Sequence, residues 1–142
     1  MKIATGSDHG GFKLKEKIKE HLKGKKIAVR DYGAFSDEPV DYPDIGRAVA
    51  KAVSAGRYRF GILVCGTGLG MSMVANKVKG IRAAVCHDLY TAEMARKHND
   101  ANIIALGGRV LSTDRALKLI DVFLKTKFEG GRHLRRVKKI GK

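Results

Sequence analysis

Two glycine-rich segments contain side chains that could carry out chemistry. Residues 6–11 place Asp8 and His9 among glycines, and the second segment is Cys65-Gly66-Thr67-Gly68-Leu69-Gly70. Glycines let backbone N–H groups turn toward an anion, and a helix that begins in the loop adds partial positive charge. The same positive end favours a thiolate at Cys65, which could act as a nucleophile or as a general base. The alternative is a tight turn beside a buried, inert cysteine.

Further candidate residues come later in the chain. His98 and Asn99 end a helical pattern, where the helix dipole favours an imidazolium. Arg132 and Arg136 are four residues apart, so on a helix they share a face that could bind a phosphate, and Arg109 follows the last expected strand. Each could instead be a cap, a surface residue or part of a solvated tail. No pair of His, Cys or carboxylate residues has convincing metal spacing, so we expect no metal and no cofactor.

The elements that position these residues alternate between short apolar runs and helical patterns. The expected strands are 2–6, 26–32, 60–65, 81–86 and 102–106, and the expected helices are 12–24, 45–56, 69–79, 89–97 and one that begins at Ser112 or Thr113. A turn-rich stretch, 33–44, precedes the second helix. Continuous apolar strands are typical of parallel sheets that helices cover on both faces.

We therefore expect an α/β fold, a three-layer Rossmann-like sandwich with a five-stranded parallel sheet flanked by helices. The chain is expected to be one domain over residues 1–142, in which 130–142 form a basic tail that contacts a partner subunit. Ligands bind at the carboxyl ends of the strands in this architecture, where both glycine-rich segments should lie. His98 and Asn99 end a helix, so only tertiary folding could bring them near.

The charge of the chain favours anionic ligands. Lys and Arg total 29 against 14 Asp and Glu, a net charge of +15, which attracts nucleic acid, acidic lipid or phosphorylated metabolites. Few aromatic residues and no known recognition motif argue against nucleic acid, and the apolar runs are too short to cross a membrane. Two cysteines outside any C-x-x-C pair and no signal peptide indicate the cytoplasm. The seven lysines within 13–26 predict a solvated helix face.

A dinucleotide site is weakly indicated. The spacing G-x-G-x-x-G fails in the second segment because position 71 is Met, although Asp31 stands where a ribose-binding acid would stand.

Six ordered motifs resemble the type B ribose-5-phosphate isomerase family, which includes galactose-6-phosphate isomerase subunits and an allose-6-phosphate isomerase. The motifs span essentially the whole chain, at 6–11, 40–44, 65–72, 80–84, 98–102 and 130–133. The resemblance implies interconversion of ribose 5-phosphate and ribulose 5-phosphate in the pentose phosphate pathway. An isomerase of allose 6-phosphate or galactose 6-phosphate is the alternative, and a nucleic-acid-binding module is a remote one.

The resemblance also implies a role for each site residue. Cys65 would be the base that moves a proton between C2 and C1, and Thr67 and Asp8 would handle the hydroxyl protons. His98 would open the furanose ring. The implied binding residues are Gly66, Gly68 and Gly70 for the enediolate, Tyr42 and Asn99 for the sugar, and His9, Arg109, Arg132 and Arg136 for the phosphate. The last two would reach in from the second subunit of a homodimer or homotetramer.

Overall fold

Strands and helices alternate along the chain in a computed structural model that describes residues 1–141. The strands are β1 (Lys2–Ser7), β2 (Ala28–Asp31), β3 (Phe60–Cys65), β4 (Ala83–Val85) and β5 (Ile103–Gly107). The helices are α1 (Phe12–Gly24), α2 (Tyr42–Ser54), α3 (Leu69–Ala75), α4 (Leu89–Lys97), α5 (Thr113–Lys125) and α6 (Arg132–Ile140). The expected elements are all present, and the basic tail is helical. Its last residue, Lys142, lies outside the described part.

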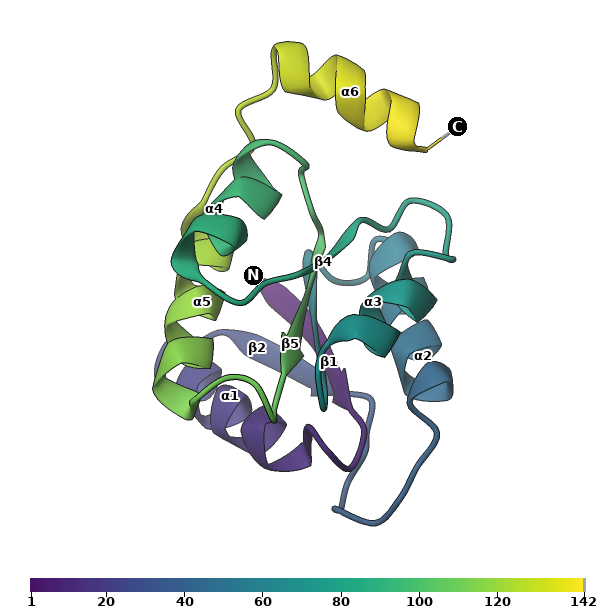
Figure 1. The fold of residues 1–142 in the computed structure, drawn as a ribbon, viewed down its shortest axis with the longest axis vertical. Helices are drawn as coiled ribbons and strands as arrows, with labels where there is room; N and C mark the ends of the chain where they lie inside the picture. The colour runs from purple at the N-terminus through teal and green to yellow at the C-terminus, as the bar shows by residue number, and fades with distance from the viewer. Residues whose placement is uncertain (142) are drawn as a thin grey trace.

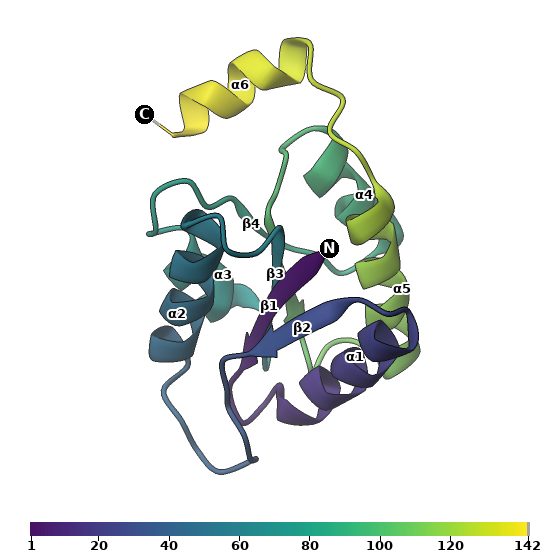
Figure 2. The same cartoon turned by 180° about the vertical axis from the view of Figure 1, so that it is seen from behind.

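All five strands are parallel, in the order β2-β1-β3-β5-β4. Helices α1, α4 and α5 cover one face of the sheet, and α2 and α3 cover the other (Figures 1 and 2). The crossovers through α1 and α4 run in one direction along the sheet, and those through α2 and α3 run in the opposite direction. Right-handed crossovers require this division between the two faces. The prediction of a three-layer α/β sandwich is confirmed.

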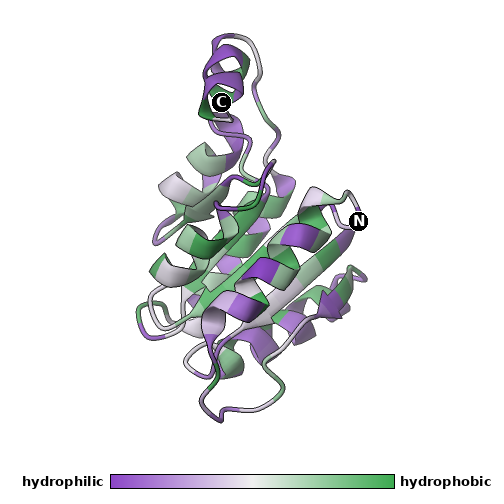
Figure 3. Ribbon diagram, turned by 90° about the vertical axis from the view of Figure 1, so that its right-hand side faces the viewer, coloured by the Kyte–Doolittle hydropathy of each residue, from purple (hydrophilic) through white to green (hydrophobic). Residues whose placement is uncertain are grey.

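The core consists of two apolar layers, one on each face of the sheet. Leu14, Ile18 and Leu22 of α1 pack with α4 and α5, while Val49 and Val53 of α2 pack with α3. Strand β3 is buried along its whole length because both layers cover it. Figure 3 shows hydrophobic residues gathered in the sheet, whereas α6, which extends away from the sandwich, is largely hydrophilic. Within residues 1–141, no helix is both long and apolar enough to span a membrane.

Several boundaries differ from the sequence prediction, among them those of α2, α3 and β4. Helix α2 begins at Tyr42, within the expected turn-rich stretch, because Pro43 is tolerated in a first helical turn. Helix α3 ends at Ala75 because the side chain of Asn76 turns to the edge strand. Its amide donates to the carbonyl of Ala83 at 2.9 Å and accepts from the Ala83 N–H at 2.7 Å. Strand β4 is accordingly limited to three residues.

The lysine-rich helix is not solvated throughout. Lys15 is fully buried, and its ammonium group lies 2.9 Å from Asp31 at the end of β2. Lys19 contacts the other carboxylate oxygen at 2.8 Å. Asp31 therefore joins α1 to the sheet, and its two oxygens are engaged by lysines rather than free for a ribose.

Candidate active site

Three loops meet at the carboxyl ends of β1, β3 and β5. The Asp8 N–H donates to the Val64 carbonyl at 3.2 Å, and the Gly108 N–H donates to the Cys65 carbonyl at 2.7 Å. The Arg109 N–H donates to the Gly66 carbonyl at 3.0 Å. Between β1 and β3 the chain departs toward opposite faces of the sheet. This is the topological switch point at which α/β sheets bind their ligands.

Glycines allow these loops to approach so closely. A Cβ atom on Gly11 would lie 2.6 Å from the Val64 carbonyl, and one on Gly108 would lie 2.7 Å from the Gly10 carbonyl oxygen. Both distances are shorter than the non-bonded contacts that Cβ atoms make in proteins, and backbone atoms cannot move aside as a side chain can. The glycines of the first and third loops are therefore required by packing as well as by any ligand.

Cys65 ends β3 with its sulfur directed at its own loop. The residue is 5% exposed, and its Sγ accepts the backbone N–H of Gly68 at 3.1 Å. Gly68 makes this contact from a left-handed conformation with φ of 83°. The sulfur thus lies beside a backbone donor at the switch point of the sheet.

Two oxygen-bearing side chains belong to the glycine-rich loops at this edge of the sheet. Asp8 is 8% exposed, and its Oδ1 accepts the Gly11 N–H at 3.0 Å. The Thr67 oxygen accepts the Leu69 N–H at 3.2 Å, which leaves the hydroxyl proton free to be donated. A carboxylate acceptor and a hydroxyl donor can together pass protons between two oxygens of a bound ligand.

His9, Arg109 and Tyr42 complete the group at this edge. The His9 Nδ1 accepts the Val40 N–H at 3.3 Å, so the proton of a neutral ring is assigned to Nε2, where it can be donated to an anion. The Arg109 side chain lies against both glycine-rich loops. A Cβ atom added to Gly66 would lie 3.3 Å from the Arg109 guanidinium. The Tyr42 ring covers Gly70, where a Cβ atom would lie 2.6 Å from it.

The remaining predicted residues lie at the opposite edge of the sheet. Cys65 pairs with Gly107 at the end of β5, whereas His98 and Asn99 precede Ile103 at its beginning. Four strand steps of about 3.3 Å separate these edges by roughly 13 Å. Arg132 and Arg136 are exposed on α6, which extends beyond that second edge (Figure 1). One copy of the chain therefore does not bring these four residues to Cys65.

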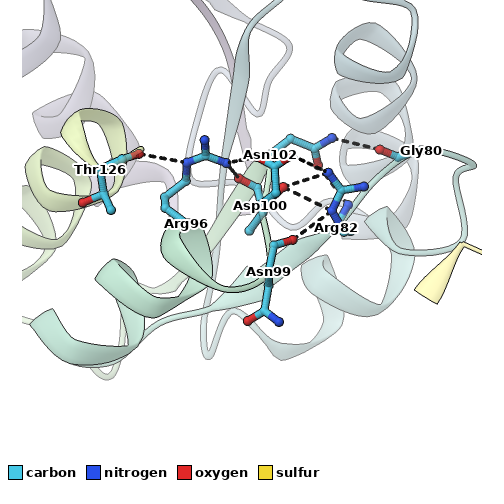
Figure 4. Close-up of polar contacts among 8 residues, drawn as sticks. Gly80, Arg82, Arg96, Asn99, Asp100, Asn102 and Thr126 are labelled. Carbon is cyan, nitrogen blue, oxygen red and sulfur yellow. Dashed lines mark hydrogen bonds and ion pairs between the residues drawn. The ribbon is translucent and has the colours of Figure 1, made fainter. Parts of the chain in front are cut away.

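The segment that carries His98 and Asn99 is held by two arginines (Figure 4). Arg82 donates to the carbonyls of Asn99 and Asp100 at 2.9 Å and to the Asp100 carboxylate at 3.2 Å. Arg96 is 2% exposed and donates to Asp100 at 2.8 Å and to the Ala101 carbonyl at 2.6 Å. Asp100 has a φ of 46°, a left-handed conformation that its contacts to the two arginines maintain.

Sequence reasoning did not assign a role to either arginine. Arg82 stood within one of the six motifs, so a signal existed, but a motif does not reveal which backbone atoms a side chain reaches. Arg96 was placed only within the expected helix 89–97. Its burial depends on the rings of Phe60 and Phe123, which its guanidinium faces at 4.8 and 5.8 Å.

Comparisons with known proteins agree with this architecture. Residues 3–140 match the family model described as Ribose/Galactose Isomerase. Ribose-5-phosphate isomerase B of Escherichia coli K12 is 48% identical to the chain over 139 residues, which are 98% of this chain and 93% of that protein.

Two solved structures extend the agreement to the backbone. Ribose-5-phosphate isomerase B of Clostridium thermocellum superposes with a TM-score of 0.98 at 57% identity, over 99% of this chain and 95% of that chain. The enzyme of Mycoplasma genitalium, solved with bound ribulose-5-phosphate, has a TM-score of 0.92 at 46% identity, over 98% and 93% of the two chains. The matching loops, helices and sheet order are thus those of one family, and the chain belongs to the Ribose/Galactose Isomerase family.

Proposed function

We propose that the chain interconverts ribose 5-phosphate and ribulose 5-phosphate through an enediolate. The observation that carries the proposal is the Cys65 sulfur, which accepts the Gly68 N–H at 3.1 Å at the switch point of the sheet. A base beside backbone donors is what moving a carbonyl between C1 and C2 requires. The names of the relatives, and the ribulose-5-phosphate bound to one of them, support the same substrate pair.

In this mechanism Cys65 moves the carbon-bound proton. Its thiolate takes the proton from C2 of the open-chain aldose, and the C–H electrons form the C1=C2 double bond while negative charge develops on O1. The thiol then returns the proton to C1, and the ketone forms at C2 as the O2 proton leaves. Thr67 and Asp8 exchange the hydroxyl protons between O1 and O2. The N–H groups of the Cys65–Gly70 loop stabilise the enediolate, at about 3 kcal/mol for each well-placed donor.

His9 and Arg109 bind the phosphate from the same copy of the chain. Both lie at the edge that holds Cys65, and both can donate to an anion. A phosphate held at the far end of the sugar supplies binding energy that orients C1 and C2 over the sulfur. Tyr42 closes one side of this space by covering Gly70.

A second copy of the chain supplies His98, Asn99, Arg132 and Arg136. In one copy these four residues are remote from Cys65, and α6 extends from the sandwich with Leu134 and Ile140 exposed. A homodimer in which α6 crosses to its partner would bring the ring-opening His98 and two further phosphate ligands to each sulfur. We propose that residues 1–142 act as one domain whose tail, from 130, contacts the partner, and that two free cysteines suit a cytoplasmic location.

An assay of the purified chain tests the reaction. Ribose 5-phosphate should be converted to ribulose 5-phosphate, and allose 6-phosphate under the same conditions should react more slowly. Preference for the hexose would retain the mechanism and replace the substrate. Inactivity toward both sugars, in a chain that is folded and dimeric, would contradict the proposed function.

A further inference from the structure

Three side chains with metal-binding atoms meet where α6 begins. They are His98 at the end of α4, Glu129 in the connection between α5 and α6, and His133 in the first turn of α6. Their ligand atoms all lie within 4.8 Å of one another, and His98 Nε2 lies 3.6 Å from a Glu129 oxygen. The two imidazole rings are stacked, with centroids 4.2 Å apart and an interplanar angle of 10°.

The backbone holds this cluster together. The Glu129 N–H donates to the Lys97 carbonyl at 3.1 Å, which ties the connection to the end of α4. Gly130 and Gly131 both have positive φ, 69° and 54°, and they turn the chain so that His133 lies over His98. His133 is 7% exposed, whereas the side chains of His98 and Glu129 are 38% and 47% exposed. The cluster is thus preformed on one side and open to solvent on the other.

Two imidazoles and one carboxylate are a ligand set for zinc and similar divalent ions. Metal–ligand bonds of about 2.0–2.1 Å place tetrahedral ligand atoms about 3.3 Å apart, so small side-chain rotations would close the cluster around an ion.

We propose that a divalent transition-metal ion of the zinc class binds His98, Glu129 and His133 and inhibits the isomerase. The bound ion would occupy Nε2 of His98, the side chain that is proposed to open the sugar ring, and would hold α6 against α4. The proposal of metal binding depends only on the geometry of these three side chains. The inhibition rests on the role of His98 in the proposed function.

Cobalt(II) is the probe for binding, because its spectrum reports its ligands. Titration of the full chain should give visible bands of a nitrogen- and oxygen-ligated ion, at one ion per chain. Glu129→Gln and His133→Ala should each weaken this binding about tenfold or more, since each removes a ligand. Glu20→Gln, the same kind of substitution at an exposed carboxylate of α1, should bind as the wild type does. Absence of binding, equal binding by all four proteins, or a sulfur-to-cobalt charge-transfer band would overturn the site.

Zinc inhibition is then measured with ribose 5-phosphate, each variant being compared with its own metal-free activity. The wild type and Glu20→Gln should be inhibited and should recover on chelation, while Glu129→Gln should need about tenfold more zinc, in line with its weaker binding. Cobalt binding without inhibition would overturn the inhibitory role and leave the metal site standing. A chain that binds cobalt as described but never isomerises sugars would contradict the proposed function alone.

Discussion

The two cysteines occupy different chemical environments. Burial raises the pKa of Cys86 to about 12, so this thiol stays protonated at neutral pH. Cys65 is also buried, but its sulfur accepts a backbone N–H and lies in the loop where the site residues of one copy gather. Both cysteines therefore belong to the apolar core, but only the Cys65 sulfur faces the loops in which the proposed base would act.

Replacement of Cys65 tests this distinction. Cys65→Ala should lower kcat/KM for ribose 5-phosphate by about 10²–10⁴-fold, the usual contribution of a general base. Cys86→Ala is the matched control and should retain most of the activity, with a modest loss of stability from the smaller core side chain. Steady-state kinetics and urea unfolding of both variants make the comparison. Near-normal turnover by Cys65→Ala would assign the base to another residue.

Between elements, charged pairs set which segments stay together. Asp31 at the end of β2 accepts from the buried Lys15 and from Lys19 of α1, and Gly33 donates its N–H to the same carboxylate at 2.8 Å. Burial alone would raise the pKa of Asp31, but the hydrogen bonds from Lys19, Lys15 and Gly33 outweigh it and lower that pKa below 3.8. The contacts of Asp31 with the two lysines join α1 to the edge strand β2, which has one neighbour in the sheet.

Asp31→Asn should destabilise the fold in a pH-dependent way. A carboxylate whose pKa is lowered by folding stabilises the protein at pH values above its pKa in the unfolded chain. This stabilisation is lost as the pH falls through its pKa in the folded protein. At neutral pH the variant leaves Lys15 buried without its charge partner, which costs about 3 kcal/mol. Urea unfolding should show this difference in the free energy of unfolding between wild type and variant at neutral pH, and a smaller difference in acid. Asp37→Asn, in an exposed loop, is the control, and a gap that does not change with pH would contradict the ion-pair explanation.

Arg82 acts on the loop between α4 and β5. Arg82→Ala removes the donors to the carbonyls of Asn99 and Asp100 and frees the segment that presents His98. We expect kcat to fall about tenfold or more, because small displacements of positioned groups are costly, while KM changes less. Arg57→Ala, on an exposed residue after α2, should leave both constants near the wild-type values. A change in stability with unaltered kinetics would show that Arg82 serves the fold alone.

At the scale of the whole molecule, the predicted site residues divide between two edges of one sheet. Asp8, Cys65 and Arg109 lie at the carboxyl edge, while His98 and the α6 arginines lie beyond the amino edge. A single compact domain cannot fold these edges together, since the parallel sheet separates them. Two copies related by a twofold axis can bring these edges together, because the amino edge of each copy would then face the carboxyl edge of the other.

Mixed dimers test whether sites are shared. Cys65→Ala and Arg132→Ala should each be nearly inactive alone. After mixing and subunit exchange, half of the dimers carry one copy of each variant, and one of their two sites is intact. Activity should therefore return to about a quarter of the wild-type value. Sedimentation confirms that the dimers exchange and persist, and a mixture as inactive as its components would show that each site belongs to one chain.

The sequence by itself determined the order of the elements and indicated candidate residues for the chemistry. Alternating apolar runs and helical periods predicted the parallel sandwich, since buried strands must be apolar on both faces. The glycine-rich loops could be located because strand ends and glycines are visible in the letters. The start of α2 and the end of α3 were misplaced. Periodicity does not encode the tolerance of a first helical turn for proline or the contacts that Asn76 makes.

Only the tertiary structure decided which of these residues meet. It showed Lys15 buried against Asp31, Arg82 and Arg96 around Asp100, and His98 stacked on His133. Such contacts join positions far apart in the chain, and sequence spacing carries no information about distances across a fold. The same holds for the separation of Cys65 from His98, because the direction of a helix relative to its sheet places its end at one edge or the other.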